Sequence, residues 1–206
     1  MSAVKGCFIT GTDTGIGKTV VATMLCLRWG AHYWKPVQSG RLPATDSEFV
    51  QSFIGKEKIC PETYLFKNPL SPNQAASLEN IEIDLERLHL PQSSPLVVEG
   101  AGGVMVPLNR DYQMIELIKK FNLPAVIVAR SELGTLNHTF LTLQALRLRQ
   151  IDVMGVVLVG PENELNRKSI AEIGDVKILC EIPRVREITL SWMQEMATRM
   201  PILKMN

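Results

Sequence analysis

A glycine-rich stretch near the start of the chain, residues 11–19, constrains the fold more than any other feature. It has glycines at 11, 15 and 17, and it lies between a β-prone apolar run at 7–10 and a helix-favouring run at 20–27. A strand, a glycine-rich turn and a helix in this order are typical of a phosphate-binding loop, whose backbone N–H groups face the phosphates. Lys18 would then reach the β- and γ-phosphates, and the Thr19 hydroxyl would bind Mg²⁺. The alternative is an ordinary turn with a surface lysine, because Gly11 lies one position before the glycine of the usual pattern.

Length, charge and cysteine content narrow the class of protein. The 206 residues suffice for one α/β domain, which we expect to span residues 1–206. The formal net charge is +1 and the basic residues are scattered, so we expect no nucleic-acid partner and no membrane-binding patch. No apolar run approaches the ~18 residues of a membrane span, and nothing at the N-terminus resembles a signal peptide. The four cysteines lie far apart without a Cys-x-x-Cys pair, which indicates a reduced, cytoplasmic protein.

Apolar runs that alternate with helical patterns predict the fold class. Strands are expected at 4–10, 32–34, 95–99, 124–129, 153–159 and 176–181, and helices at 17–28, 114–121, 136–150 and 190–198. A short helix is expected to begin near Asp46, and residues 84–90 carry a brief helical pattern, whereas 61–80 are expected to be irregular. Near-continuous apolar strands separated by helices indicate an α/β fold: a doubly wound, mainly parallel sheet with helices on both faces, like a P-loop NTPase.

Two carboxylates are candidates for metal ligands. Glu99 ends the apolar run 96–98 and is followed by glycines, which is the placement of a Walker-B acid at the carboxyl edge of the sheet. Asp46 follows the second strand on a loop and could supply a second acid. The alternatives are a structural strand-end carboxylate for Glu99 and a plain helix cap for Asp46.

Lys35 is unusual because it stands between an apolar strand and Pro36, with Ser39 four residues later. Pro36 and Gly40 predict that the strand gives way to a loop here, at the sheet edge where α/β proteins bind ligands. A cation at this edge could stabilise an anionic intermediate or a phosphoryl oxygen. The alternative is a strand-end lysine on the surface.

Together these pieces resemble the dethiobiotin synthase family. The matching segments are 11–14 with 17–19, then 35–40, Asp46, 98–103 and 133–139, so the resemblance covers about residues 4–185. It implies that 7,8-diaminononanoate, CO₂ and ATP give dethiobiotin, ADP and phosphate through a carbamate and a carbamic–phosphoric anhydride. It also implies Mg²⁺ as the cofactor, ATP as a co-substrate, no biotin cofactor, and a homodimer whose active site lies at the interface.

The resemblance assigns roles to individual residues. It implies Lys18 and Lys35 as catalytic residues and Thr19, Asp46 and Glu99 as metal ligands. It implies that the nucleotide is bound by Gly15, Ile16, Gly17, Lys18, Thr19, Val20, Asp46, Glu99, Gly100, Ala101, Gly102, Pro183, Arg184 and Val185. It implies that the diamine is bound by Thr14, Lys35 and Ser39, with its carboxylate held by Gly134, Thr135, Leu136 and Asn137 of the neighbouring subunit.

Two departures from the family pattern have different consequences. Val159 and Gly160 stand where many members carry an asparagine that reads the nucleotide base, so we expect weak discrimination among bases. Gly15 stands where some members carry a glutamate, so this loop has one carboxylate fewer.

Two other functions are possible for a phosphate loop on this fold. An ATP-dependent amidoligase on the same fold would lack the 35–39 segment and usually carry a glutaminase domain. A partitioning or septum-positioning ATPase would carry an extra lysine in the phosphate loop, at the position of Asp13.

Overall fold

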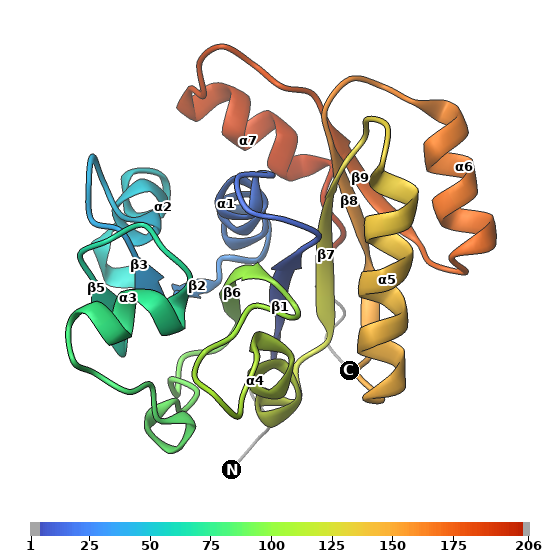
Figure 1. The fold of residues 1–206 in the computed structure, drawn as a ribbon. Helices are drawn as coiled ribbons and strands as arrows, with labels where there is room; N and C mark the ends of the chain where they lie inside the picture. The colour runs from blue at the N-terminus through green and yellow to red at the C-terminus, as the bar shows by residue number, and fades with distance from the viewer. Residues whose placement is uncertain (1–4, 204–206) are drawn as a thin grey trace.

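A computed structural model describes residues 5–203, and its centre is a parallel sheet of seven strands in the order β4-β2-β6-β1-β7-β8-β9 (Figure 1). Every neighbouring pair in this sheet is parallel. The predicted α/β class with a parallel sheet is therefore confirmed. The strands are β1 (Gly6–Gly11), β2 (His32–Trp34), β4 (Ile59–Cys60), β6 (Leu96–Gly103), β7 (Ala125–Arg130), β8 (Val153–Val159) and β9 (Ile178–Ile182).

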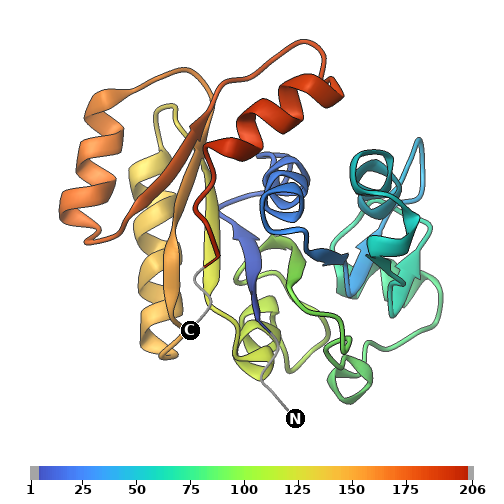
Figure 2. The ribbon, with the colours of Figure 1, turned by 180° about the vertical axis from the view of Figure 1, so that it is seen from behind.

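Helices cover both faces of the sheet, as predicted for a doubly wound fold. In Figures 1 and 2, α1 and α7 lie on the opposite side of β7 and β8 from α5 and α6. Side chains of β1 alternate between the two layers, with Cys7 and Ile9 in one apolar cluster and Phe8 in the other. The longer helices are α1 (Lys18–Trp29), α2 (Asp46–Ile54), α4 (Met114–Phe121), α5 (Thr135–Leu148), α6 (Glu164–Ile173) and α7 (Leu190–Thr198). Within residues 5–203, no helix has the length and apolar character needed to cross a bilayer.

Three expectations about secondary structure were wrong. The segment 61–80, predicted to be irregular, contains β5 (Tyr64–Phe66) and α3 (Pro72–Leu78). Strand β5 forms because Tyr64 and Phe66 bury their rings. Helix α3 begins with Pro72, and proline is tolerated in the first turn of a helix. The predicted loop after Lys35 contains β3 (Val37–Ser39), which pairs in parallel with β5 in a second, two-stranded sheet. Helix α6 was not predicted.

The short strand β4 was not predicted either, and β6 runs to Gly103 instead of ending at Glu99. The other differences concern boundaries. The predicted start of the first strand, at residue 4, lies outside the described residues, and the last strand begins at Ile178 instead of 176. Residues 84–90 form only the single 3₁₀ turn η2 (Leu85–Arg87), and a similar turn, η1 (Lys56–Lys58), precedes β4.

Close contact between β1 and β6 places the phosphate loop beside the end of β6. Gly11 pairs with Gly103 across the two strands, and a Cβ atom on Gly103 would lie 3.0 Å from the carbonyl oxygen of Gly11. The loop then turns through Gly15 and Gly17, whose φ angles of 71° and 99° lie in the left-handed region that glycine tolerates. Gly17 directly precedes α1, so the loop runs into the helix N-terminus as predicted.

Thr45 caps α2, which leaves the carboxylate of Asp46 available for other contacts. The Thr45 hydroxyl accepts a hydrogen bond from the Glu48 N–H at 3.1 Å, and a Glu48 carboxylate oxygen accepts one from the Thr45 N–H at 2.7 Å. This reciprocal pair is a capping box. The alternative that Asp46 is the helix cap is therefore wrong.

Replacing Thr45 by alanine is expected to lower the free energy of unfolding by about 1 kcal/mol, because the Glu48 N–H loses its acceptor. Replacing it by serine keeps the hydroxyl and should cost much less. Urea denaturation of the three proteins measures the difference. Equal losses for T45A and T45S would show that the methyl group, and not the cap, matters.

Candidate active site

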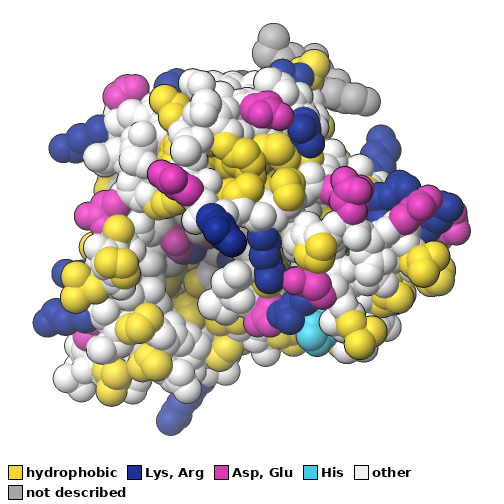
Figure 3. Space-filling view, turned by 90° about the horizontal axis from the view of Figure 1, so that it is seen from above, with side chains coloured by type: hydrophobic (Ala, Val, Ile, Leu, Met, Phe, Trp, Pro, Cys, Tyr) yellow, Lys and Arg dark blue, Asp and Glu magenta, His cyan; other side chains and the backbone are white. Residues whose placement is uncertain are grey.

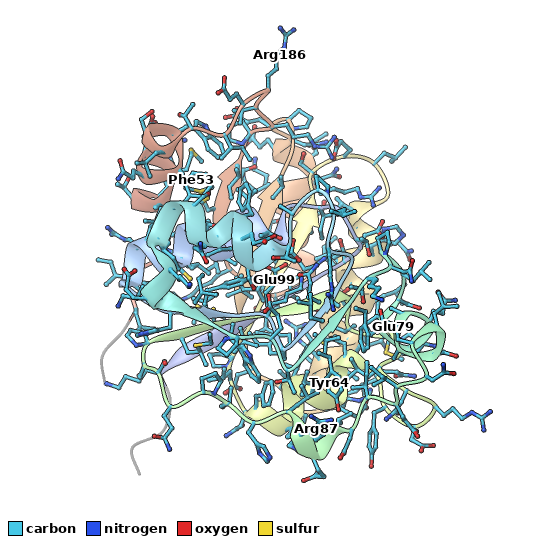
Figure 4. All side chains as sticks on the ribbon, turned by 90° about the vertical axis from the view of Figure 1, so that its left-hand side faces the viewer. Phe53, Tyr64, Glu79, Arg87, Glu99 and Arg186 are labelled. Carbon is cyan, nitrogen blue, oxygen red and sulfur yellow. The ribbon has the colours of Figure 1, made fainter. Side chains whose placement is uncertain are left out.

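A cavity of about 920 Å³ opens at the carboxyl ends of β1, β2 and β6. Figure 3 looks onto this end of the molecule, where charged side chains of both signs gather across the middle of the face. Most of the predicted site residues line the cavity: Thr14, Gly15, Gly17, Lys18, Thr19, Val20, Lys35, Ser39, Asp46, Glu99, Ala101 and Gly102. Glu99 lies deep in the interior, as Figure 4 shows. The structure thus brings the phosphate loop, both carboxylates and both lysines together.

Lys35 forms a buried ion cluster with the two carboxylates. Its Nζ lies 2.5 Å from Oδ2 of Asp46 and 2.9 Å from Oε1 of Glu99. Lys35 is 4% exposed and Glu99 1%, so the alternative of a surface lysine is wrong. Burial by itself would lower the pKa of Lys35, but the Glu99 and Asp46 carboxylates outweigh it and raise the pKa. Lys35 therefore carries its positive charge inside the site.

The Thr19 hydroxyl completes a set of three oxygen donors. It lies 3.0 Å from Oδ1 of Asp46 and 3.0 Å from Oε1 of Glu99. One hydroxyl and two carboxylates are the ligand types that Mg²⁺ prefers, and the Lys35 ammonium shows that the two carboxylates accommodate a cation. Residues 5–203 contain no cluster of three or more His, Cys, Asp or Glu side chains suited to a metal, so a bound ion would need the hydroxyl, water or phosphate as further ligands.

Tyr33 is a site residue that the sequence analysis missed. Its hydroxyl donates a 2.8 Å hydrogen bond to Oε2 of Glu99, and burial, with the nearby carboxylates, raises the pKa of Tyr33 well above its usual range. Tyr33 pairs with Val97 in the β2–β6 register. Lys35 follows two residues later, just after the end of β2, and contacts the same Glu99 carboxylate. The period of two along β2 was the signal that could have revealed it.

Gln38 was also missed, and it fixes the loop that carries Asp46. Its side-chain oxygen accepts a 3.3 Å hydrogen bond from the Asp46 N–H. Its side-chain nitrogen donates to the carbonyl oxygens of Ser39 and Gly40, at 3.1 Å each. Gln38 is buried and thereby connects β3 to the start of α2.

Lys18 points back into the phosphate loop. Its Nζ donates a 2.9 Å hydrogen bond to the carbonyl oxygen of Asp13. Burial lowers the pKa of Lys18 to about 8, although the Glu99 carboxylate opposes this shift. A phosphate group in the loop would supply the negative charge that this buried lysine lacks.

The structure does not bring the other predicted residues to the cavity wall. Ile16 is buried in the core beneath the loop, and the Gly100 carbonyl oxygen lies 3.4 Å from Nζ of Lys35. Residues 183–185 lie exposed after β9, and Arg184 pairs with Glu132 at 3.1 Å. Figure 4 shows Arg186 of the same loop pointing outward.

Gly134 precedes α5, and the first turn of this helix contains Thr135, Leu136 and Asn137. The binding of the substrate carboxylate by these residues of a neighbouring subunit stays a prediction.

Comparison with known proteins agrees with this geometry. A family described as AAA domain matches residues 5–191. The ATP-dependent dethiobiotin synthetase BioD of Paramagnetospirillum magneticum is 46% identical over 187 residues, which are 90% of this chain and 91% of that protein. The enzyme of the same name from Brucella ovis is 46% identical over 88% of this chain and 87% of its own length. The biotin biosynthesis bifunctional protein BioCD of Bordetella avium is 42% identical over 98% of this chain and 45% of its own length.

Solved structures share the fold at low sequence identity. A ParA family ATPase from Chlorobium tepidum TLS superposes with a TM-score of 0.58 over 95% of this chain and 90% of that chain, at 13% identity. The MinD cell division protein of Aquifex aeolicus gives a TM-score of 0.54 over 93% of this chain and 86% of that chain, also at 13% identity. These likenesses confirm the P-loop NTPase-like fold and carry no further conclusion.

Replacing Lys35 by methionine is expected to lower the free energy of unfolding by about 3–5 kcal/mol, because it leaves two carboxylates without a buried counter-charge. Replacing Glu99 by glutamine in the same protein should recover part of the loss. Chemical denaturation of the wild type, both single variants and the double variant measures this coupling. A loss below ~1 kcal/mol in K35M would contradict a buried ion cluster and match an exposed pair.

Proposed function

The chain belongs to the ATP-dependent dethiobiotin synthetase family, and we propose that it converts 7,8-diaminononanoate, CO₂ and ATP into dethiobiotin, ADP and phosphate. The observation that carries the proposal is the meeting of Lys18 of the phosphate loop with Lys35, Asp46 and Glu99 in one cavity. A triphosphate on the loop and a small diamine beside Lys35 would have their reacting groups next to each other there.

The reaction needs charge stabilisation more than a protein nucleophile. One amine of the substrate adds to CO₂ and forms a carbamate, whose oxygen attacks the γ-phosphorus of ATP and releases ADP. The second amine then attacks the carbonyl of the resulting anhydride, closes the ureido ring and expels phosphate. Lys18 would neutralise the transferred phosphoryl group, and Lys35 would stabilise the carbamate. Thr14 and Ser39 would position the diamine from the cavity wall.

The oxygen donors Thr19, Asp46 and Glu99 would hold Mg²⁺ with the nucleotide. The ion would supply positive charge against the β- and γ-phosphate oxygens. Lys35 uses the same two carboxylates in this structure, so its ammonium group would have to share them with the ion or turn toward the substrate. A biotin cofactor is not needed, because the amine that captures CO₂ belongs to the substrate.

The protein would act as a homodimer in the cytoplasm, with its active site at the interface. The N–H groups at residues 134–137, at the start of α5, would hold the substrate carboxylate of the neighbouring subunit, since helix N-termini favour anions. Residues 183–185 would approach the base and ribose of the nucleotide.

The alternative function, a partitioning ATPase, is not favoured. Asp13 stands where those ATPases carry a lysine, and the solved structures of ParA and MinD proteins share only the fold with this chain.

Purified protein supplied with diaminononanoate, bicarbonate and Mg-ATP is expected to form dethiobiotin. Replacing Lys18 or Lys35 by alanine should lower the rate by about 100-fold or more, because each removes charge stabilisation of the phosphoryl or carbamate oxygens. Lys168→Ala, at an exposed ion pair with Glu164, is the matched control and should keep the wild-type rate. Unchanged product formation in either site variant would remove the role proposed for that lysine.

Discrimination among nucleotides is expected to be weak, because Val159 and Gly160 offer no side-chain amide to the base. The kcat/KM values for ATP, GTP, CTP and UTP should therefore differ by less than ~100-fold, or ~2.7 kcal/mol. Steady-state kinetics with each nucleotide measures this ratio. A larger preference for ATP would mean that other groups read the base.

A further inference from the structure

Asp13 at the tip of the phosphate loop joins three contacts that hold the loop. Its Oδ1 accepts a 2.7 Å hydrogen bond from the Thr14 N–H, and its carbonyl oxygen accepts the bond from Lys18. Its Oδ2 forms an ion pair with the guanidinium group of Arg130. The neighbouring residues 13–15 are exposed and belong to neither a helix nor a strand. The tip of the loop therefore depends on contacts made through Asp13.

Arg130 reaches the loop from an interior strand of the central sheet. It is the last residue of β7, which pairs with β1 on one side and with β8 on the other, and it lies opposite Val159 in that register. Its Nε is buried and has no hydrogen-bond partner among residues 5–203. Within the described part of the chain, the ion pair with Asp13 is the polar contact of this guanidinium group.

The charge of Asp13 makes this pair relevant to binding. A phosphate loop binds a polyanion, and an uncompensated carboxylate on its tip would repel the ligand. Asp13 nevertheless orders the Thr14 N–H, which the loop needs for its shape. A cation that neutralises Asp13 and keeps it in place satisfies both requirements.

We propose that Arg130 is a positioning residue for the nucleotide: through its ion pair with Asp13 it fixes the phosphate loop and cancels a negative charge beside the phosphates. The proposal rests on the proposed binding of ATP by this loop. Arg130 itself makes no contact with the reacting atoms, and its effect passes through Asp13. The effects of replacing Arg130 and Asp13 on the affinity for ATP are therefore coupled.

The test is a binding cycle measured by calorimetry with Mg-ATP on the full chain, using Arg130→Ala, Asp13→Asn, the double variant and Arg130→Lys. R130A should weaken ATP binding about tenfold, because it exposes the Asp13 charge. The double variant should bind within about threefold of wild type, because asparagine keeps the acceptor for Thr14 without the charge. R130K should recover most of the affinity. Arg199→Ala, which removes an exposed ion pair with Glu195, is the control.

Salt and nucleotide charge provide a second readout that simple loss of packing would not change. The defect of R130A should shrink as ionic strength rises, and it should be larger for ATP than for AMP. Equal affinity of R130A and wild type would overturn the inference, as would a double variant that binds no better than R130A. A wild type that bound no ATP would overturn both the inference and the proposed function, whereas the other failures would leave that function standing.

Discussion

The buried ammonium group of Lys35 between two carboxylates is the interaction on which the active site depends. It joins the end of β2, the start of α2 and the middle of β6, because Asp46 begins α2 and Glu99 lies within β6. Tyr33 and Thr19 bind the remaining carboxylate oxygens, so the cluster also reaches the phosphate loop. Such a cluster is costly to bury unless each charge is compensated, and here each carboxylate has at least two partners. We therefore infer that this cluster serves the function of the site and not the stability of the fold.

The phosphate loop shows how one fold serves different functions. The chain shares its architecture with ParA and MinD proteins at 13% identity, yet its sequence relatives are dethiobiotin synthetases. In this chain the charged groups Lys18, Lys35 and Glu99 line the cavity at the carboxyl edge of the sheet. A fold therefore predicts where a ligand binds, and the residues at that edge decide the chemistry.

Much of the site followed from the sequence because parallel strands place their carboxyl ends together. Glu99 and Lys35 each follow an apolar run, and this predicted that both lie at the carboxyl edge of the sheet. The ion pair between them was not predicted. Helix α6 was missed because most of its residues are polar and it buries only Ile170. The β3–β5 sheet was missed because both strands are short and lie among prolines and polar residues, and because burial of their side chains stabilises them.

The contact between Arg130 and Asp13 could not be predicted from the sequence, because it depends on the pairing of β1 with β7.

In the proposed reaction, an oxygen of CO₂ becomes an oxygen of the released phosphate through attack of the carbamate on ATP. The most direct measurement is turnover with ¹⁸O-labelled bicarbonate, followed by mass spectrometry of phosphate and dethiobiotin. We expect one labelled oxygen in each phosphate and one in the ureido carbonyl, because the anhydride breaks at its carbonyl carbon. Unlabelled phosphate, formed while labelled dethiobiotin accumulates, would contradict this transfer of oxygen.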